Sequence, residues 1–139
     1  MRQARALYVA AVALMVVAAC NRGHPFDPEN LPQFSNDTNL FEWHAVAMAN
    51  VSASQNFTWH TTGSWAVVFT EPELTKGSAL LRVWGATGTP VFSRDLEVFG
   101  GAPTTIDTAG AWTIEIRLSG ATGSLSFWVE SSTLLPDSS

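Results

Sequence analysis

The sequence predicts an all-β fold, an antiparallel β-sandwich of seven or eight strands that is immunoglobulin-like or jelly-roll-like, preceded by a signal helix and an irregular tether. Three observations support this prediction. Apolar and polar residues alternate with a period of two in several short runs, glycine-rich turns recur about every ten residues, and helical periodicity is nearly absent between residues 38 and 132. Short strands separated by such turns are typical of two packed antiparallel sheets.

The chain begins with a segment of a different kind. Residues 1–5 contain Arg2 and Arg5, and residues 6–17 form an apolar run. This run is too short to span a hydrocarbon layer, which needs about 20 apolar residues. A basic start followed by a short apolar run is typical of a secretory signal peptide.

The end of this run, Val17-Ala18-Ala19-Cys20, resembles the lipobox of bacterial lipoprotein precursors. The resemblance implies that residues 1–19 are a signal peptide, that cleavage occurs before Cys20, and that lipid on the Cys20 thiol anchors the protein to a membrane. Because residue 21 is Asn and not Asp, it also implies the outer membrane where the host has one. An ordinary signal peptide with a chance cysteine is the alternative.

Residues 20–37 contain three prolines together with Asn, Asp and Gly, a composition that opposes both helix and central strand. We expect an irregular tether that lifts the sandwich domain, residues 38–132, off the lipid surface. Fully extended, the tether would reach about 55 to 60 Å. Docking onto the domain is the alternative for its apolar residues, Phe26, Leu31 and Phe34. Residues 133–139 are expected to form a short polar tail.

The strands of the domain follow one another between turn signals. The first of them has a short helix as its alternative, and the third ends where Pro72 removes a donor from the ladder. The expected strands before residue 111 are NLFEWHAVAMANVS (39–52), QNFTWHTTG (55–63), SWAVVFTEPEL (64–74), GSALLRVWG (77–85), TPVFSRDLEVFGG (89–101) and TTIDTAG (104–110).

The last two runs show the clearest alternation. In AWTIEIRLS (111–119) and SLSFWVESS (124–132), every second residue is apolar over most of the run. Gly120 and Gly123 lie between the runs and can adopt turn conformations that other residues resist. We therefore expect a hairpin. Residues 107–131 resemble the closing hairpin of prepeptidase C-terminal type domains, which implies a non-catalytic, extracytoplasmic accessory module and transfers no functional residue.

The charge of the chain excludes some partners. Removal of residues 1–19 takes away two of the seven basic side chains and leaves five against twelve acidic ones, a net charge of 5 − 12 = −7. Nucleic acid and anionic headgroups are therefore poor partners. Cys20 is the only cysteine, so an internal disulfide is excluded.

Six tryptophans are the most conspicuous candidates for binding. Trp112 shares a strand face with isoleucines and is expected in the core. Trp84 and Trp128 lie on the faces opposite the apolar stripes, so they are our candidate ligand-binding residues, because exposed indoles could stack on sugar rings or a partner protein. The alternative is that the N-terminal segment covers the face with Leu80 and Trp84, or that this face forms a second, minor core.

The ionisable residues give a weaker signal. His44 and His60 each follow a tryptophan, and Asp95 and Glu97 are two apart on one expected strand, as an acid pair of a glycosidase could be. Metal-ligand spacing, a serine nucleophile elbow and a phosphate-binding glycine loop are all absent from the sequence. We therefore expect no cofactor, no metal and no catalytic residue.

Taken together, these patterns predict a non-catalytic, lipid-anchored lipoprotein of the bacterial cell envelope. Its β-sandwich would bind a protein partner, an envelope polymer or a glycan. The alternative is a small envelope hydrolase or a metal-binding protein that uses Asp95, Glu97, His44 or His60.

Overall fold

The computed structural model describes residues 24–132, so the predicted signal peptide, Cys20 and the polar tail of residues 133–139 lie outside the described residues. One turn of 3-10 helix, η1 (Pro28–Asn30), precedes the strands. The strands are β1 (Gln33–Asp37), β2 (Leu40–Thr61), β3 (Trp65–Trp84), β4 (Pro90–Asp95), β5 (Gly100–Pro103) and β6 (Gly110–Ser132). In the described range, no helix is long and apolar enough to cross a membrane.

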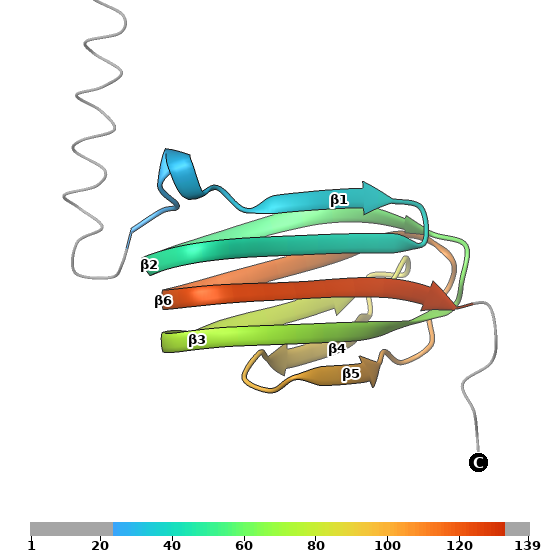
Figure 1. Cartoon of the computed structure of the whole chain (residues 1–139). Helices are drawn as coiled ribbons and strands as arrows, with labels where there is room; N and C mark the ends of the chain where they lie inside the picture. The colour runs from blue at the N-terminus through green and yellow to red at the C-terminus, as the bar shows by residue number, and fades with distance from the viewer. Residues whose placement is uncertain (1–23, 133–139) are drawn as a thin grey trace, which may run out of the picture.

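All strand pairs are antiparallel, and the strand order is β1-β2-β6-β3-β4, with β5 also paired to β3. The strands β2, β3 and β6 contain 22, 20 and 23 residues, far above the usual length of about 5 to 6. Figure 1 shows that each of these three strands folds back at the same end of the molecule. One long strand therefore supplies a segment to each of two layers.

The first layer consists of β1, the first halves of β2 and β3, the second half of β6, and β5. The second layer consists of the second halves of β2 and β3, the first half of β6, and β4. The predicted antiparallel β-sandwich is thus confirmed. Six strands replace the seven or eight expected, because predicted neighbours along the chain merge into continuous bent strands. The helix alternative for residues 39–52 is wrong, since most of that segment belongs to β2.

The predicted hairpin at the end of the chain is also wrong. Residues 111–119 and 124–132 are the two halves of β6 and pair with β2 and β3 rather than with each other. Gly120 and Gly123 do have positive φ values, 58° and 122°, but they form a bend within the strand. The register is irregular at the same level in β2, between Ala45 and Ala53, and in β3, between Leu74 and Ser78. Bulges of this kind let a sheet fold over sharply.

The core lies between the two layers and is rich in aromatic side chains. Trp112 is fully buried, as its position among isoleucines predicts, and packs edge-to-face on Trp59 with 5.9 Å between ring centroids. The Trp59 Nε1–H donates to the Asp37 carbonyl at 3.0 Å, which ties β1 to the second layer. A further stack joins Trp43 and Phe127. These rings close the space between the layers with few polar atoms inside.

The segment predicted as a tether differs from the expectation from His24 onward. Residues 33–37 form β1, Phe34 packs on Phe57 at 4.8 Å, and Phe26 packs edge-to-face on Trp43 at 6.3 Å. The His24 N–H donates to the Asn50 carbonyl at 2.9 Å. All three prolines of this segment precede β1, so none of them removes a hydrogen-bond donor from the ladder between β1 and β2.

Candidate ligand-binding surface

The outer face of the first layer carries a cluster of aromatic side chains. Opposed residues of an antiparallel pair project to the same face, so the register places Glu42, Trp128, Phe69 and Gly101 in one row across four strands. The Trp128 and Phe69 rings stack with centroids 5.3 Å apart and planes 17° apart. Both side chains are half-buried, so part of each ring remains accessible from solvent.

The glycine in this row has a steric role. A Cβ on Gly101 would lie 2.8 Å from the Phe69 ring, which shows that the ring lies against the backbone of β5. Phe69 is therefore held between that backbone and Trp128. This arrangement fixes the ring pair before any ligand binds, which lowers the entropic cost of binding.

Two shallow hollows flank the ring pair. One, of about 190 Å³, is lined by Trp65, Phe69 and Glu130 with their neighbours on β3 and β6. The other, of about 180 Å³, is lined by Trp128, Glu71 and the side chain of Phe99, which is 61% exposed. Trp65 is four residues from Phe69 on the same face, or about 13 Å along the strand. We call Trp65, Phe69, Phe99 and Trp128 the aromatic face.

A polar row runs beside the stacked rings. It consists of Gln33, His44, Ser126 and Glu71, one from each of β1, β2, β6 and β3. The His44 Nδ1 is in hydrogen-bond contact with the Ser126 Oγ. The strand segments of the first layer include no lysine or arginine, whereas Glu42, Glu71 and Glu130 lie on its outer face. The surface around the rings is therefore negative and rich in hydrogen-bond acceptors.

Trp84 lies on the other layer, so the structure does not bring the two predicted tryptophans together. The Arg82 guanidinium covers the Trp84 ring at 5.2 Å from its centroid. Glu115 accepts hydrogen bonds from the Arg82 Nε and Nη2 at 2.8 and 2.6 Å, and Arg117 lies 3.6 Å from the same carboxylate. The half-buried Trp84 indole is thus covered by Arg82, which is held by Glu115. The face is covered, as the alternative to a binding surface allowed, but the cover comes from charged side chains of the same layer.

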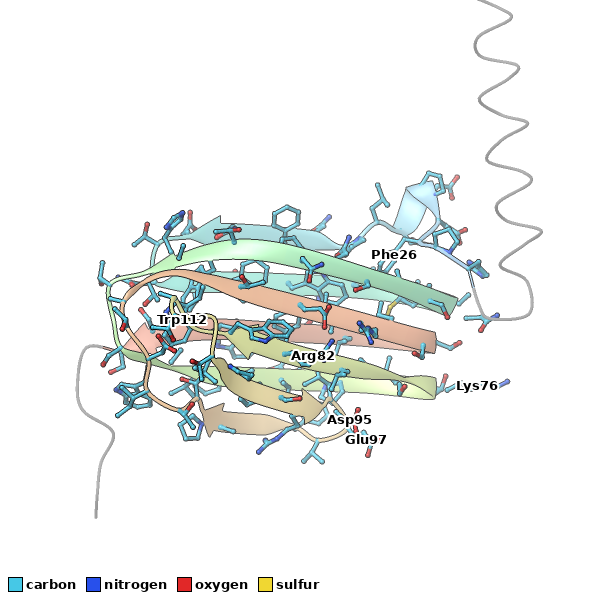
Figure 2. The ribbon with its side chains drawn as sticks, turned by 180° about the vertical axis from the view of Figure 1, so that it is seen from behind. Phe26, Lys76, Arg82, Asp95, Glu97 and Trp112 are labelled. Carbon is cyan, nitrogen blue, oxygen red and sulfur yellow. The ribbon has the colours of Figure 1, made fainter. Side chains whose placement is uncertain are left out.

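The residues of the alternative function, a hydrolase or a metal-binding protein, are not brought together into one site. His44 lies in the first-layer half of β2 and His60 in the second-layer half, opposite Ala111. β4 ends at Asp95, so Glu97 falls in the following loop and does not share a strand face with it, contrary to prediction. Figure 2 shows both acids toward the end of the molecule at which β2, β3 and β6 fold back. Over residues 24–132, no group of three or more His, Cys, Asp or Glu could hold a metal ion.

Sequence reasoning missed Phe69 and Trp65. Their run, SWAVVFTEPEL, is apolar on both faces, because Ala66 and Val68 fill the core while Trp65, Val67 and Phe69 project outward. Alternation therefore gave no sign of which face was outside. The available signal was the size difference, since the larger aromatic side chains lie on the face opposite the smaller buried ones.

These features define an antiparallel β-sandwich with an aromatic surface on one layer. No family model matches the chain. No curated protein matches it either.

Several solved structures show a partly similar arrangement of strands. Procruciferin, an 11S globulin from Brassica napus, has 14% identity and a TM-score of 0.41, and the match covers 80% of this chain but only 28% of that one. TmCBM61, solved in complex with β-1,4-galactotriose, has 16% identity and a TM-score of 0.38, and the match covers 74% of this chain and 70% of that one. The Gap123 glycosylation-associated protein complex from Streptococcus agalactiae has 12% identity and a TM-score of 0.33, and the match covers 84% of this chain and 47% of that one. At these scores, the fold assignment rests on the strand pairing of this chain alone.

Proposed function

We propose that the protein is a non-catalytic, glycan-binding lipoprotein of the bacterial cell envelope, anchored through lipid on Cys20, and that the aromatic face is its binding surface. One observation carries the proposal: a stacked, partly accessible pair of rings, Trp128 and Phe69, is flanked by two hollows and a polar row. Binding sites for small ligands typically combine aromatic walls with a few polar groups that fix orientation.

The chemistry of sugars fits this surface. A pyranose ring has apolar C–H faces and hydroxyl groups at its edge, so it needs an aromatic wall with hydrogen-bonding groups beside it. The rings of Trp128 and Phe69 supply the wall, and the carboxylates of Glu42 and Glu71 accept hydrogen bonds from hydroxyls. Trp65, about 13 Å away along β3, would let an oligosaccharide contact the surface at more than one sugar unit.

The charge of the face narrows the class of glycan. Glu42, Glu71 and Glu130 would repel the carboxylates or phosphates of an acidic polymer, and no basic side chain of the first-layer strands offsets them. We therefore expect neutral glycans to bind and acidic ones to be excluded. Affinity for a neutral glycan should also depend little on salt, since no ion pair across the interface would be screened.

The anchor is supported by the order of features along the chain. A basic start, an apolar run and Val17-Ala18-Ala19-Cys20 precede the folded domain, and the resemblance to a lipobox accounts for the single cysteine. Several acyl chains would hold the protein durably, because each buried methylene contributes about 0.8 kcal/mol.

Glycan binding can be tested with matched tryptophan variants. Neutral and acidic oligosaccharides are titrated calorimetrically into the wild-type protein and into Trp128→Ala, Phe69→Ala and Trp84→Ala. We expect at least a tenfold loss of affinity for neutral glycans in the first two variants, because aromatic anchors dominate such interfaces, and little change in Trp84→Ala, which removes the same residue type from the other layer. Equal affinities in all four proteins would contradict the proposed surface. Absence of glycan binding, with capture of an envelope protein that Trp128→Ala loses, would indicate a protein partner instead.

Anchoring has a separate test. When the full chain is produced in a bacterial host, Cys20→Ser should move the protein from the membrane fraction to the soluble fraction. A variant protein that stays in the membrane fraction would rule out the lipid anchor.

A further inference from the structure

We propose that the domain does not stand on a stalk but rests on the lipid surface with its bent end, defined as residues 46–52 of β2, 74–78 of β3 and 119–123 of β6. This inference rests on the lipid anchor at Cys20 proposed above. It assigns the bent end as the surface that the short segment after Cys20 holds against the lipid.

The first described residue, His24, is bonded to the bend of β2. The His24 N–H donates to the Asn50 carbonyl at 2.9 Å, and the Ser52 N–H donates to the His24 carbonyl at 2.8 Å. These bonds form a parallel bridge between His24 and Val51, at the bend of β2. Figure 2 places Phe26 toward the same end as Lys76, which lies in the bend of β3. The anchor segment is thus attached to the bent end.

The chain between Cys20 and this bend is short. Only residues 21–23 separate Cys20 from His24. The four Cα-to-Cα steps from Cys20 to His24 span at most about 14 Å when fully extended, against the 55 to 60 Å expected if all of residues 20–37 were free. The opposite end of the sandwich lies further from the anchor by the part of β6 beyond the bend, residues 124–132, or about 30 Å. Lipid on Cys20 would therefore hold the bent end close to the bilayer.

Near His24, the bent end is uncharged and partly apolar. Residues 46–52, VAMANVS, and residues 119–124, SGATGS, contain no charged side chain. Val46 is 46% exposed at this bend. Charged residues occur around this centre. Glu73 lies just before the bend of β3 and Lys76 within it, Asp27 lies beside η1, and Glu29 lies within η1. An uncharged, partly apolar centre with an acidic margin suits zwitterionic lipid better than anionic lipid.

This orientation has a consequence for the proposed binding surface. Both layers run from the bent end to the opposite end, so the aromatic face would form a wall that stands steeply on the membrane (Figure 1). A ligand would reach it from the side, within about 44 Å of the lipid, the sum of about 14 Å of tether and about 30 Å of strand.

The test uses fluorescence quenching by lipid. The full chain is produced in a bacterial host, purified with its lipid, and incorporated into phosphatidylcholine vesicles that carry a nitroxide on some headgroups. Ala49→Cys at the bent end and its matched control Ala86→Cys at the opposite end, both exposed in the structure, are labelled with the same fluorophore. We expect several-fold stronger quenching at position 49 than at position 86. A third protein, with about 20 Gly and Ser residues inserted between Gly23 and His24, should lose most of that difference while it stays on the vesicles.

Each outcome decides a different point. Equal quenching at positions 49 and 86 on vesicle-bound protein overturns the orientation and leaves the anchor intact. Strong quenching at position 49 that survives the insertion supports direct affinity of the bent end for lipid in addition to tethering. Protein that carries no lipid and does not bind the vesicles overturns the anchor, and the orientation with it.

Discussion

The substitution Gly77→Ala tests the contact that lets three strands bend at the same level. Gly77 lies in the bend of β3 with a φ of 77°, and a Cβ there would lie 2.2 Å from the carbonyl oxygen of Gly120, in the bend of β6. Two costs follow. An alanine in the left-handed region costs about 1–2 kcal/mol. The methyl group would also press on backbone, which cannot rotate away as a side chain can.

The size of the second cost decides the outcome. Overpacking of a tightly packed site typically costs about 1–3 kcal/mol. Gly77→Ala should therefore lower the free energy of unfolding by about 2–5 kcal/mol. Gly88 provides a matched control, because its φ is 83° and a Cβ there would have nothing within 4 Å. Gly88→Ala should cost only the backbone strain of about 1–2 kcal/mol. The stabilising loss of chain entropy in the unfolded state is common to both variants and cancels in the difference.

Urea unfolding followed by tryptophan fluorescence measures both variants, since Trp43, Trp59 and Trp112 are fully buried and should change emission on unfolding. With a slope of about 2 kcal/mol/M, a difference of 2 kcal/mol separates the two midpoints by about 1 M. If Gly77→Ala is no less stable than Gly88→Ala, the bends of β3 and β6 are not in contact, and the description of three continuous bent strands fails.

Three further predictions concern the stability of the fold. Trp59→Phe should lower the free energy of unfolding by about 2–3 kcal/mol, because it leaves the Asp37 carbonyl without the Nε1–H donor and weakens the ring contact with Trp112. An unchanged urea midpoint would show that Trp59 does not stabilise the fold in this way. Glu115→Gln should lower the free energy of unfolding by about 1 kcal/mol, a value that allows for solvent screening because the Arg82 side chain is one-third exposed. Arg117→Gln should lower it by less, since the Arg117 side chain is half-exposed and lies 3.6 Å from the Glu115 carboxylate. The reverse order in urea titrations would contradict this assignment. The hydrogen bond from the Thr87 side chain, followed by those from the Thr108 and Thr87 backbone, lowers the pKa of Asp107 below its ordinary value of 3.8. The carboxylate therefore contributes stability that is present above pH 3.8 and is lost as the pH falls through the lowered pKa. The free energy of unfolding of Asp107→Asn should therefore fall less steeply with acid than that of the wild-type protein. Parallel pH profiles of the two proteins would refute this contribution.

Much of the fold could be predicted because local patterns report burial. The alternation in AWTIEIRLS placed Trp112, Ile114 and Ile116 on one face, and all three are buried in the core. The runs on either side of GATG were correctly predicted as strands, but their connection was not. Glycines with positive φ serve a hairpin turn and a strand bend equally well, and the choice depends on the strands that pair alongside, which are distant in the sequence.

The candidate site could be predicted only in part. Trp128 was identified because it lies opposite an apolar stripe, but Phe69, which stacks on it, is 59 residues away in the chain and lies in a strand that is apolar on both faces. Trp84 met the same criterion as Trp128, yet it is covered by Arg82 on the other layer. A strand pattern assigns a residue to a face, whereas the neighbours on that face depend on strand order and register.

The sequence by itself determined that the protein is a strand-rich sandwich with an aromatic core, since the period of apolar residues dictates which side of each strand must leave water. It also led us to predict the order of a signal peptide, Cys20 and the sandwich domain along the chain. Only the tertiary structure decided that the two halves of a strand lie in different layers, that Phe69 and Trp128 form one surface, and that the segment from His24 to β1 packs on the domain. The physical reason is that each of these features is a contact between segments far apart in sequence, and such contacts form only when one folded arrangement satisfies all the strands together.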